Sequence, residues 1–328
     1  MGGRDGGTDG GTDGARLTRR GLGALGLGLG GGLALAGLAG CADDGLPGGA
    51  DDPPPPEATK LPGTDVMSPR RIAYGDDPSQ WGDLYRPTAA SDPDGAPSKG
   101  VVVVVHGGFW KAEYDASLGA PLALSLAENG WTALNLEYRR VGSGDGGGGG
   151  YPATFDDVAA GIDLLADVAE LTDAERATVV TLGHSAGGHL AVWAAARGRF
   201  ERWSPMRVPV TAAVSQAGVL DLTAGLSDAN AAPNVLALMG GDAEADPAAY
   251  DAADPAQHLP LGVPVRCVHG TADTIVPLSQ SRSYVAAATA VGDDATLTEV
   301  DGDHFIVIDP ASEAWTRTLE LLEALRSA

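Results

Sequence analysis

A serine flanked by glycines is the residue of this chain best placed to act as a nucleophile. Residues 183–187 read Gly-His-Ser-Ala-Gly, with Ser185 at the centre, between a β-branched run at 178–182 and an alanine-rich helical pattern at 189–196. A strand, a tight turn and a helix present a serine hydroxyl above a sheet edge. The glycines are expected because a side chain two residues either side of the serine would collide with neighbouring backbone. The amino terminus of the helix favours a developing oxyanion.

A base for this serine is expected near the carboxyl terminus. A serine hydroxyl is a poor nucleophile at neutral pH and needs a base within hydrogen-bond reach. Where a serine sits on such a strand–turn–helix, the chain order is serine, acid, histidine. His304 follows the last predicted strand in the polar turn 301–304, and it meets that order. The other five histidines are His106, His184, His189, His258 and His269.

The acid that orients the histidine is expected in the loop after the penultimate strand. Residues 263–268 form an apolar strand pattern, and the following His-Gly-Thr-Ala-Asp ends at Asp273. A carboxylate there would fix the imidazole tautomer and stabilise the imidazolium. Asp221 is the rival, because it follows the preceding strand. Asp303 is too close in sequence to His304 to face its ring easily.

An oxyanion hole needs two backbone donors, and the sequence offers both. One is the amide of Ala186, the residue after the serine. The other is in the loop after the valine run, where residues 106–110 read His-Gly-Gly-Phe-Trp and contain Gly107 and Gly108. Glycines let the backbone approach a substrate oxygen without a side chain between them. Each donor is typically worth roughly 3–4 kcal/mol in the transition state.

The residues next to these glycines suggest an apolar substrate pocket. Phe109 and Trp110 are candidates for its walls, as is the Leu-Ala-Leu-Met stretch at 236–239. For that stretch, plain core packing is the alternative. No Cys and His cluster has the spacing of a metal site. We therefore expect neither a metal nor an organic cofactor.

The elements that must position these residues alternate between strand and helix. Residues 101–105 are five valines in a row, which is typical of a strand buried on both faces. Residues 118–129 read as a helix that stops at Gly130. The pattern predicts an α/β fold with a mostly parallel, doubly wound sheet and flanking helices. Further strands are expected at 71–74, 83–86, 131–136, 178–182, 208–214, 263–268 and 296–300, and further helices at 155–168, 189–196, 278–290 and 313–325.

Two insertions interrupt this alternation. Residues 142–150 are nearly all Gly and Ser and predict a mobile loop. Residues 221–260 lie between two strands and contain mixed helical pieces. Loops of this length are commonly lids or disordered. In a doubly wound domain that position is above the carboxyl ends of the strands, where ligands bind, so we expect a lid-like insertion there.

Composition limits the class of protein. The 328 residues are 44% hydrophobic, enough for a substantial core. The net charge of −23 is spread over the chain, which argues against nucleic acid or an anionic lipid surface as a partner. Of the two cysteines, Cys267 lies in an apolar strand pattern and is expected to be a small buried side chain.

The amino-terminal segment, residues 1–40, is expected to be a signal peptide. A twin arginine at 19–20 precedes an uncharged stretch rich in Leu, Ala and Gly at 21–40. A charged region, an apolar region and small residues before a cut make a secretory signal. The residues around the arginines resemble a twin-arginine export signal. The Leu-Ala-Gly-Cys that ends at Cys41 resembles a bacterial lipoprotein box, with an ordinary signal and a chance cysteine as the alternative.

A tether is expected to follow the signal. Residues 41–66 are rich in Pro, Gly and Asp, with almost nothing apolar, as in a semi-rigid spacer. With lipid on Cys41, the spacer would hold a catalytic domain, residues 67–328, off a membrane. We therefore expect an exported lipoprotein of the cell membrane that faces outside the cytoplasm. The oligomeric state stays open.

The chain resembles the α/β-hydrolases of the esterase and kynurenine-formamidase-like group over residues 71–325. The motifs that carry the resemblance are His-Gly-Gly-Phe-Trp at 106–110, Glu-Tyr-Arg-Arg at 137–140, Tyr-Pro-Ala-Thr at 151–154, Gly-His-Ser-Ala-Gly-Gly-His at 183–189 and His-Gly-Thr-Ala-Asp at 269–273. The resemblance implies a carboxylic ester or aryl-formamide hydrolase. It matches the family's triad to Ser185, Asp273 and His304, and its oxyanion donors to Gly107, Gly108 and Ala186.

The sequence therefore predicts a serine hydrolase that acts on a small-molecule ester through an acyl-enzyme. Three alternatives stay open. The first is hydrolysis of an aryl-formamide or peptide amide, where the leaving group is harder to protonate. The second is acyl transfer to an acceptor other than water. The third is a catalytically silent binding protein on the same scaffold.

Overall fold

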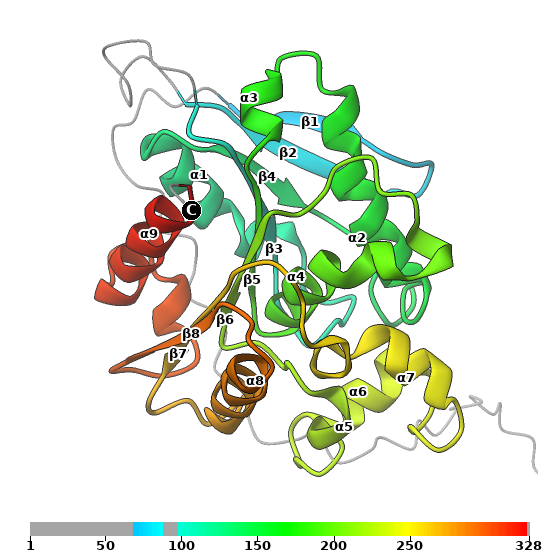
Figure 1. The fold of residues 1–328 in the computed structure, drawn as a ribbon. Coiled ribbons are helices and arrows are strands. Elements are labelled where there is room, and N and C mark those ends of the chain that lie inside the picture. The colour runs from blue at the N-terminus through cyan, green and yellow to red at the C-terminus, as the bar shows by residue number, and fades with distance from the viewer. Residues whose placement is uncertain (1–67, 88–97, 327–328) are drawn as a thin grey trace, which may run out of the picture. The chain divides into compact units, whose positions relative to one another are not determined.

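The strands form one mostly parallel sheet, as the alternating pattern predicts. The computed structural model describes residues 68–87 and 98–326. Within these ranges the sheet has eight strands in the order β1-β2-β4-β3-β5-β6-β7-β8 (Figure 1). The β1–β2 and β2–β4 pairs are antiparallel, and the remaining pairs are parallel. The bounds are β1 (Arg70–Ala73), β2 (Trp81–Tyr85), β3 (Val101–Val105), β4 (Thr132–Leu136), β5 (Val179–His184), β6 (Ala212–Gln216), β7 (Val265–Gly270) and β8 (Ala295–Val300).

Helices cover both faces of the sheet. The α-helices of the described residues are α1 (Ala120–Glu128), α2 (Ala153–Asp163), α3 (Asp173–Arg176), α4 (Ala186–Ala196), α5 (Leu222–Gly225), α6 (Ala232–Met239), α7 (Pro247–Ala253), α8 (Ser279–Ala290) and α9 (Glu313–Arg326). Short 3₁₀ helices are η1 (Ala116–Leu118), η2 (Leu164–Asp167), η3 (Arg197–Arg199), η4 (Glu201–Trp203), η5 (Pro255–His258) and η6 (Ile306–Ile308). Helices α2, α4 and α8 pack on one face, and α1 and α9 on the other.

The valine strand lies at the centre of the sheet, between β4 and β5. Successive side chains of a strand point to opposite faces. Val101, Val103 and Val105 accordingly join the core under α2 and α4. Val102 and Val104 join the core under α1 and α9. Two apolar cores therefore meet at this strand, which confirms the prediction that it is buried on both faces.

One strand is displaced from its predicted position. The apolar run at 208–214 predicts a strand, but β6 begins only at Ala212. Pro209 has no N–H to donate to a ladder. The parallel register pairs Val180 of β5 with Ala212. Val208 and Val210 are nevertheless buried, because they pack in the core beside β6.

The glycine loop at 142–150 is built from hydrogen-bonded turns, whereas the sequence predicts a mobile loop. The Gly148 amide donates to the Gly142 carbonyl (3.1 Å), and the Gly147 amide to the Gly144 carbonyl (3.0 Å). Alternate glycines from 142 to 150 have φ between 80° and 125°. Glycine adopts this region without the steric cost of a Cβ atom. The glycines of this loop therefore allow the positive φ angles that its turns require.

The inner side of the 221–260 segment belongs to the core. It carries α5, α6, α7 and η5, which lie together beside α4 in Figure 1. Val235, Leu238 and Tyr250 are buried in the same core as α2 and α4. The segment is therefore docked on the sheet domain by its apolar side, as three short helices rather than an open loop.

The predicted signal peptide (residues 1–40) and tether (41–66) lie outside the described residues. Within the described part of the chain, no helix combines the length and the apolar character needed to cross a membrane. Cys267 is fully buried on β7, as expected, and burial raises the pKa of its thiol to about 12.

Candidate active site

Ser185 stands on a strained turn between β5 and α4. Its backbone has φ 55° and ψ −119°, a conformation that L-residues rarely adopt. The Ser185 amide donates to the Gln216 carbonyl of β6 (2.8 Å). Only 2% of the residue is exposed. The turn is thus fixed by the neighbouring strand, and the helix after it starts directly at the serine.

Two glycines make this turn possible. A Cβ atom on Gly183 would lie 2.0 Å from the Gly187 carbonyl oxygen. A Cβ atom on Gly187 would lie 2.0 Å from the carbonyl oxygen of Val105, at the end of β3. Both distances are far shorter than any real contact, and the obstructing atoms are backbone. The expectation that side chains here would collide with neighbouring backbone is confirmed.

His304 and Asp273 meet across two loops at the same edge of the sheet. His304 follows β8, and Asp273 follows β7. The Nδ1 atom of His304 donates to Oδ2 of Asp273 at 2.7 Å. The Asp273 side chain is fully buried, and the His304 side chain is 4% exposed. The sequence-predicted acid and base are therefore a hydrogen-bonded pair.

This pair lies beside the serine turn. The His304 and His184 rings have their centroids 4.4 Å apart. The Nε2–H of His184 donates to the His304 carbonyl at 2.9 Å. Burial, and after it the positive charge of His304, lowers the pKa of His184 to about 3. His184, the residue directly before the nucleophile, is thus neutral, and its ring holds the His304 backbone next to the serine turn.

The Asp273 carboxylate is satisfied on both oxygens. Oδ1 accepts the backbone N–H groups of Ile275 and Val276, each at 2.9 Å. Burial would raise the pKa of Asp273, but hydrogen bonds from His269 and His304, together with the charge of His304, hold it well below its usual range. Asp273 therefore stays ionised, as an acid that stabilises an imidazolium must.

The rival acid lies elsewhere. Asp221 caps the amino terminus of α5, where its carboxylate accepts the Ala224 N–H at 2.7 Å. Its backbone N–H and C=O both bond to the Gln280 side chain. Neither contact involves His304, so of the two candidates only Asp273 is paired with the predicted base.

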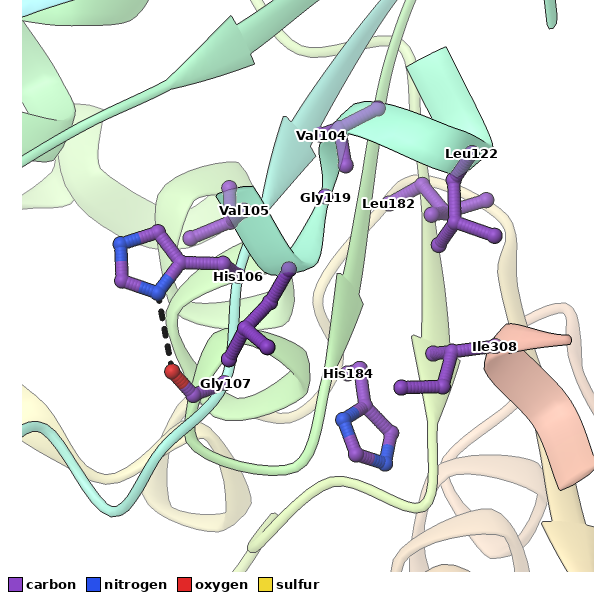
Figure 2. Close-up of a pocket in the computed structure, with 10 residues that line it drawn as sticks. Val104, Val105, His106, Gly107, Gly119, Leu122, Leu182, His184 and Ile308 are labelled. Carbon is purple, nitrogen blue, oxygen red and sulfur yellow. Dashed lines mark hydrogen bonds between the residues drawn. The ribbon is translucent and has the colours of Figure 1, made fainter. Parts of the chain in front are cut away.

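The loop after β3 passes close to the serine. A Cβ atom on Gly107 would lie 2.8 Å from the His184 carbonyl oxygen and 3.2 Å from Ser185 Cβ. The Gly107 carbonyl accepts from His106 Nδ1 at 2.9 Å (Figure 2). Since a trans peptide is planar, the N–H of Gly108 points to the opposite side of the chain. Among the described residues, no protein group accepts that N–H.

The amide of Ala186 is available in the same way. Ala186 is the first residue of α4, and the first N–H groups of a helix have no partner within the helix. No acceptor for it is present in the part of the chain that the structure describes. In the described part of the chain, two of the predicted oxyanion donors, Gly108 and Ala186, therefore have N–H groups without a protein acceptor.

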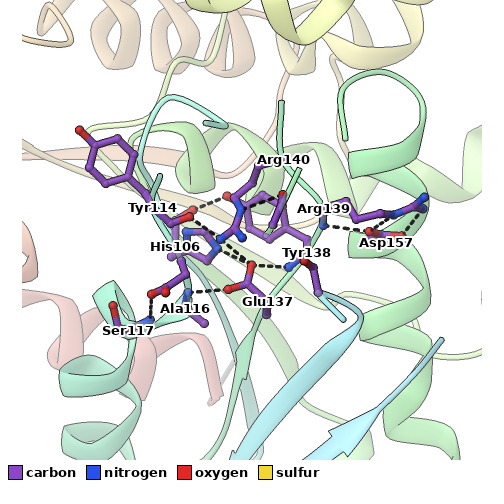
Figure 3. A network of polar contacts seen from close by, with 12 residues as sticks. His106, Tyr114, Ala116, Ser117, Glu137, Tyr138, Arg139, Arg140 and Asp157 are labelled. Carbon is purple, nitrogen blue, oxygen red and sulfur yellow. Dashed lines mark hydrogen bonds and ion pairs between the residues drawn. The ribbon is translucent and has the colours of Figure 1, made fainter. Parts of the chain in front are cut away.

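A buried polar network holds the loop after β3, which contains His106, Gly107 and Gly108 (Figure 3). The Glu137 carboxylate pairs with Arg140 at 2.8 Å and accepts the Ala116 N–H at 2.9 Å. Its Oε1 is also 3.3 Å from His106 Nε2. Both ring nitrogens of His106 face acceptors, so the two bonds form together only when the ring carries both protons. Burial would raise the pKa of Glu137, but His106 and Arg140 hold it below its ordinary value.

The sequence alone assigns these supporting residues no role of their own. Glu137 and Arg140 belong to the Glu-Tyr-Arg-Arg motif, which carries the family resemblance but has no predicted function. Tyr138, from the same motif, stacks on His106 with ring centroids 4.4 Å apart and donates to its carbonyl at 2.7 Å. The available signal was a run of charged residues directly after the apolar strand β4.

The two aromatic residues proposed for a pocket have different surroundings. Trp110 is 1% exposed and packs edge-on against His189 in the core. Phe109 is half-buried, and the Lys111 ammonium lies 5.4 Å from its ring centroid. Both have positive φ, 52° for Phe109 and 57° for Trp110. Trp110 is therefore a core residue, and only Phe109 keeps a surface open to solvent.

A small apolar cavity lies under His184, on the α1 side of the sheet (Figure 2). Val104, Leu122, Leu182 and Ile308 form its walls, and the neutral His184 ring faces it. The lining on this side is thus mostly apolar, with His106 as its other imidazole.

The fold and this constellation define an α/β-hydrolase. A family model named BD-FAE matches residues 83–287, which is more than half of the chain. The chain belongs to the BD-FAE family.

Relatives and a solved structure agree with this class. The chain is 25% identical to the esterase LipC of Mycobacterium tuberculosis over 232 residues, 68% of this chain and 55% of that protein. It is 27% identical to the isoprenylcysteine alpha-carbonyl methylesterase ICME of Arabidopsis thaliana over 252 residues, 71% and 55% of the two chains. It therefore spans about half the length of the curated relatives it matches. The structure of esterase B from Lactobacillus rhamnosis superimposes with a TM-score of 0.67 at 21% identity, covering 80% of this chain and 87% of that chain.

Proposed function

We propose that this chain is a serine esterase that cleaves carboxylic esters, with Ser185 as nucleophile, His304 as base and Asp273 as the acid that orients it. The observation that carries the proposal is the 2.7 Å bond between His304 and Asp273 beside a strained serine turn. The free N–H groups of Gly108 and Ala186 support it. The esterase names of the relatives support ester rather than amide substrates.

The reaction follows from these positions. Ser185 Oγ attacks the ester carbonyl carbon while His304 takes the hydroxyl proton. Amides of Ala186 and of the Gly107–Gly108 loop donate to the oxyanion as charge develops on it. The bond to the alcohol oxygen breaks, and His304 protonates the departing alcohol. Water then attacks the acyl-enzyme and loses a proton to His304. His304 returns that proton to Ser185 Oγ as the bond to the acyl carbon breaks, which releases the carboxylic acid.

A substrate panel tests the reaction class. We expect the purified protein to react with a fluorophosphonate probe and to hydrolyse p-nitrophenyl esters. The kcat/KM for these esters should exceed that for the matched p-nitroanilides and for N-formylkynurenine more than about tenfold, because an amide nitrogen is harder to protonate as it leaves. Faster turnover of N-formylkynurenine would favour the formamide alternative. If the protein is not labelled and hydrolyses none of these substrates, a catalytically silent binding protein is favoured.

We also propose that the protein is exported and anchored by lipid on Cys41. The support comes from sequence alone: the twin arginine at 19–20, the apolar stretch at 21–40 and the Leu-Ala-Gly-Cys that ends at Cys41. Several acyl chains on one residue would anchor a protein stably, whereas one would not. The tether at 41–66 would then separate the esterase domain from the membrane.

Replacing Cys41 by alanine tests the anchor. We expect Cys41→Ala to move the protein from the membrane fraction to the soluble fraction, with the same kcat/KM for p-nitrophenyl esters, because the cysteine carries the lipid and no catalytic group. The measurement is fractionation of intact cells with activity assayed in each fraction. Cys267→Ala is the control, since its buried thiol takes no part in anchoring. Unchanged partitioning of Cys41→Ala would contradict the proposal.

A further inference from the structure

Asp273 faces a second imidazole besides that of His304. The Nε2 atom of His269, the last residue but one of β7, lies 3.1 Å from Oδ2 of Asp273. This is the same oxygen that accepts from His304. His269 Nε2 is also 3.0 Å from the Val276 carbonyl. Both neighbours are acceptors, so Nε2 carries a proton and shares it between them.

Ser281 on α8 determines which nitrogen of His269 carries that proton. Its Oγ lies 2.8 Å from His269 Nδ1. With Nε2 protonated, Nδ1 is an acceptor, so the serine hydroxyl donates to it. Both side chains are completely buried. Water therefore cannot replace either bond, and the ring is fixed in one tautomer and one orientation.

These contacts restrain the carboxylate at both oxygens. Oδ1 is held by the Ile275 and Val276 amides, and Oδ2 lies between two imidazole N–H groups. A carboxylate held in this way cannot rotate about its Cβ–Cγ bond without losing several charge-assisted hydrogen bonds. Its Oδ2 therefore stays aimed at His304 throughout the reaction.

We propose that His269, held by the Ser281 hydroxyl, is a positioning residue of this site, which donates to Asp273 and fixes the carboxylate that orients His304. The inference rests on the proposed function and deepens it. The order of contacts is Ser281 to His269, His269 to Asp273, and Asp273 to His304. This series of hydrogen bonds thus runs from His304, in the loop after β8, to Ser281 on α8.

Removing the His269 donor raises the basicity of the Asp273 carboxylate. With one donor fewer, Oδ2 is more basic and stabilises the His304 imidazolium more strongly. The acidic limb of the pH profile of kcat/KM, which reports this histidine, then moves to higher pH. The titratable groups that face His269 or the Asp273 carboxylate are Asp273 itself, His304 and Glu299 of β8 and its loop, and His184 of β5. Cys267 of β7 faces Ser281 instead.

Three variants test the proposal. His269→Leu removes both ring nitrogens, whereas His269→Gln keeps an amide N–H near the position of Nε2. Ser281→Ala leaves His269 in place but removes the group that sets its tautomer. We expect His269→Leu to lower kcat about tenfold or more, with KM changed far less and the acidic limb at higher pH. His269→Gln should recover most of kcat, and Ser281→Ala should show the same changes as His269→Leu at smaller size.

Ser283→Ala is the matched control, because Ser283 is an exposed serine of the same helix. It should leave kcat and the pH profile unchanged. A His269→Leu enzyme with the kcat and pH profile of the wild type would overturn the proposal. Equal losses in His269→Leu and His269→Gln, with an unshifted pH profile, would also overturn it, because they would indicate packing alone.

A second measurement needs no turnover. The proton on His304 Nδ1 is bonded to Asp273, and its low-field proton resonance can be recorded in the resting protein. We expect His269→Leu to move this resonance further downfield, because a more basic Oδ2 makes a stronger bond. An unchanged resonance would overturn the proposal. If the wild type neither labels nor turns over, the esterase assignment fails while this spectrum still decides the role of His269.

Discussion

Replacing Ser185 by alanine is expected to lower kcat for p-nitrophenyl esters by about 10⁶-fold and to abolish fluorophosphonate labelling. The reason is that the alanine variant has no oxygen to attack the carbonyl or the phosphonate, and His304 has no proton to accept. The alanine methyl group fits the turn, since the strained backbone is held by the Gln216 carbonyl rather than by the side chain. The measurements are initial rates and gel detection of the labelled protein.

Ser143→Ala is the control for this variant, because Ser143 is an exposed serine of the glycine loop. It should label and turn over like the wild type. If Ser185→Ala still labels and hydrolyses esters while remaining folded, the nucleophile is another residue and the assignment of this site is wrong.

Asp273→Asn is expected to lower kcat by about 10⁴-fold while Asp221→Asn leaves kcat near the wild-type value. An amide in place of the carboxylate presents an N–H to His304 Nδ1, which favours the wrong tautomer and leaves a developing imidazolium without a counter-charge. Asparagine at position 221 still caps α5, because it is as good a cap as aspartate. Rates for both variants on the same ester make the comparison. The reverse order of losses would make Asp221 the acid.

The pKa of Asp273 gives the same variant a second readout. The folded state holds this pKa below its usual range, so the charged carboxylate stabilises the fold above the unfolded-state value, and this contribution is lost as the pH falls through the folded-state value. Asp273→Asn lacks that contribution. We therefore expect the difference in free energy of unfolding between wild type and variant to be largest at neutral pH and to narrow in acid. A difference independent of pH would contradict the depressed pKa.

Local sequence pattern was sufficient where one residue type had a single physical explanation. Five consecutive valines predicted a central strand, and the two cores on either side of β3 account for all five. The glycines around Ser185 predicted a turn with no room for Cβ atoms, and the distances at Gly183 and Gly187 agree. Chain order favours His304 as the base and leaves Asp273 with Asp221 as its rival, because parallel strands bring their carboxyl ends to one edge. The bond to His304 distinguishes Asp273 from Asp221.

The sequence pattern was not sufficient where strand pairing or tertiary packing determines the structure. The run at 208–214 is apolar because Val208 and Val210 pack beside the sheet, but the strand itself is set by the register with β5. The turns of the loop at 142–150 could not be predicted, because glycine composition shows conformational freedom and does not show the hydrogen bonds that use it. Glu137 contacts His106 and Ala116, which lie in other elements far from it in sequence, so the local sequence could not assign it this supporting role.

The 221–260 segment is held on α4 by hydrogen bonds that need particular side chains on α4 but no particular side chains in the segment. His189 donates to the Ala253 carbonyl at 2.8 Å, and Trp193 donates to the Ala252 carbonyl at 2.9 Å. Both donors belong to the helix that begins at the nucleophile, and both acceptors are main-chain atoms that every amino acid supplies. Side chains on the outer surface of the segment can therefore diverge among related proteins without disturbing the clamp on that helix. Substitutions on the exterior of the 221–260 segment are therefore expected to leave the position of Ser185 unchanged.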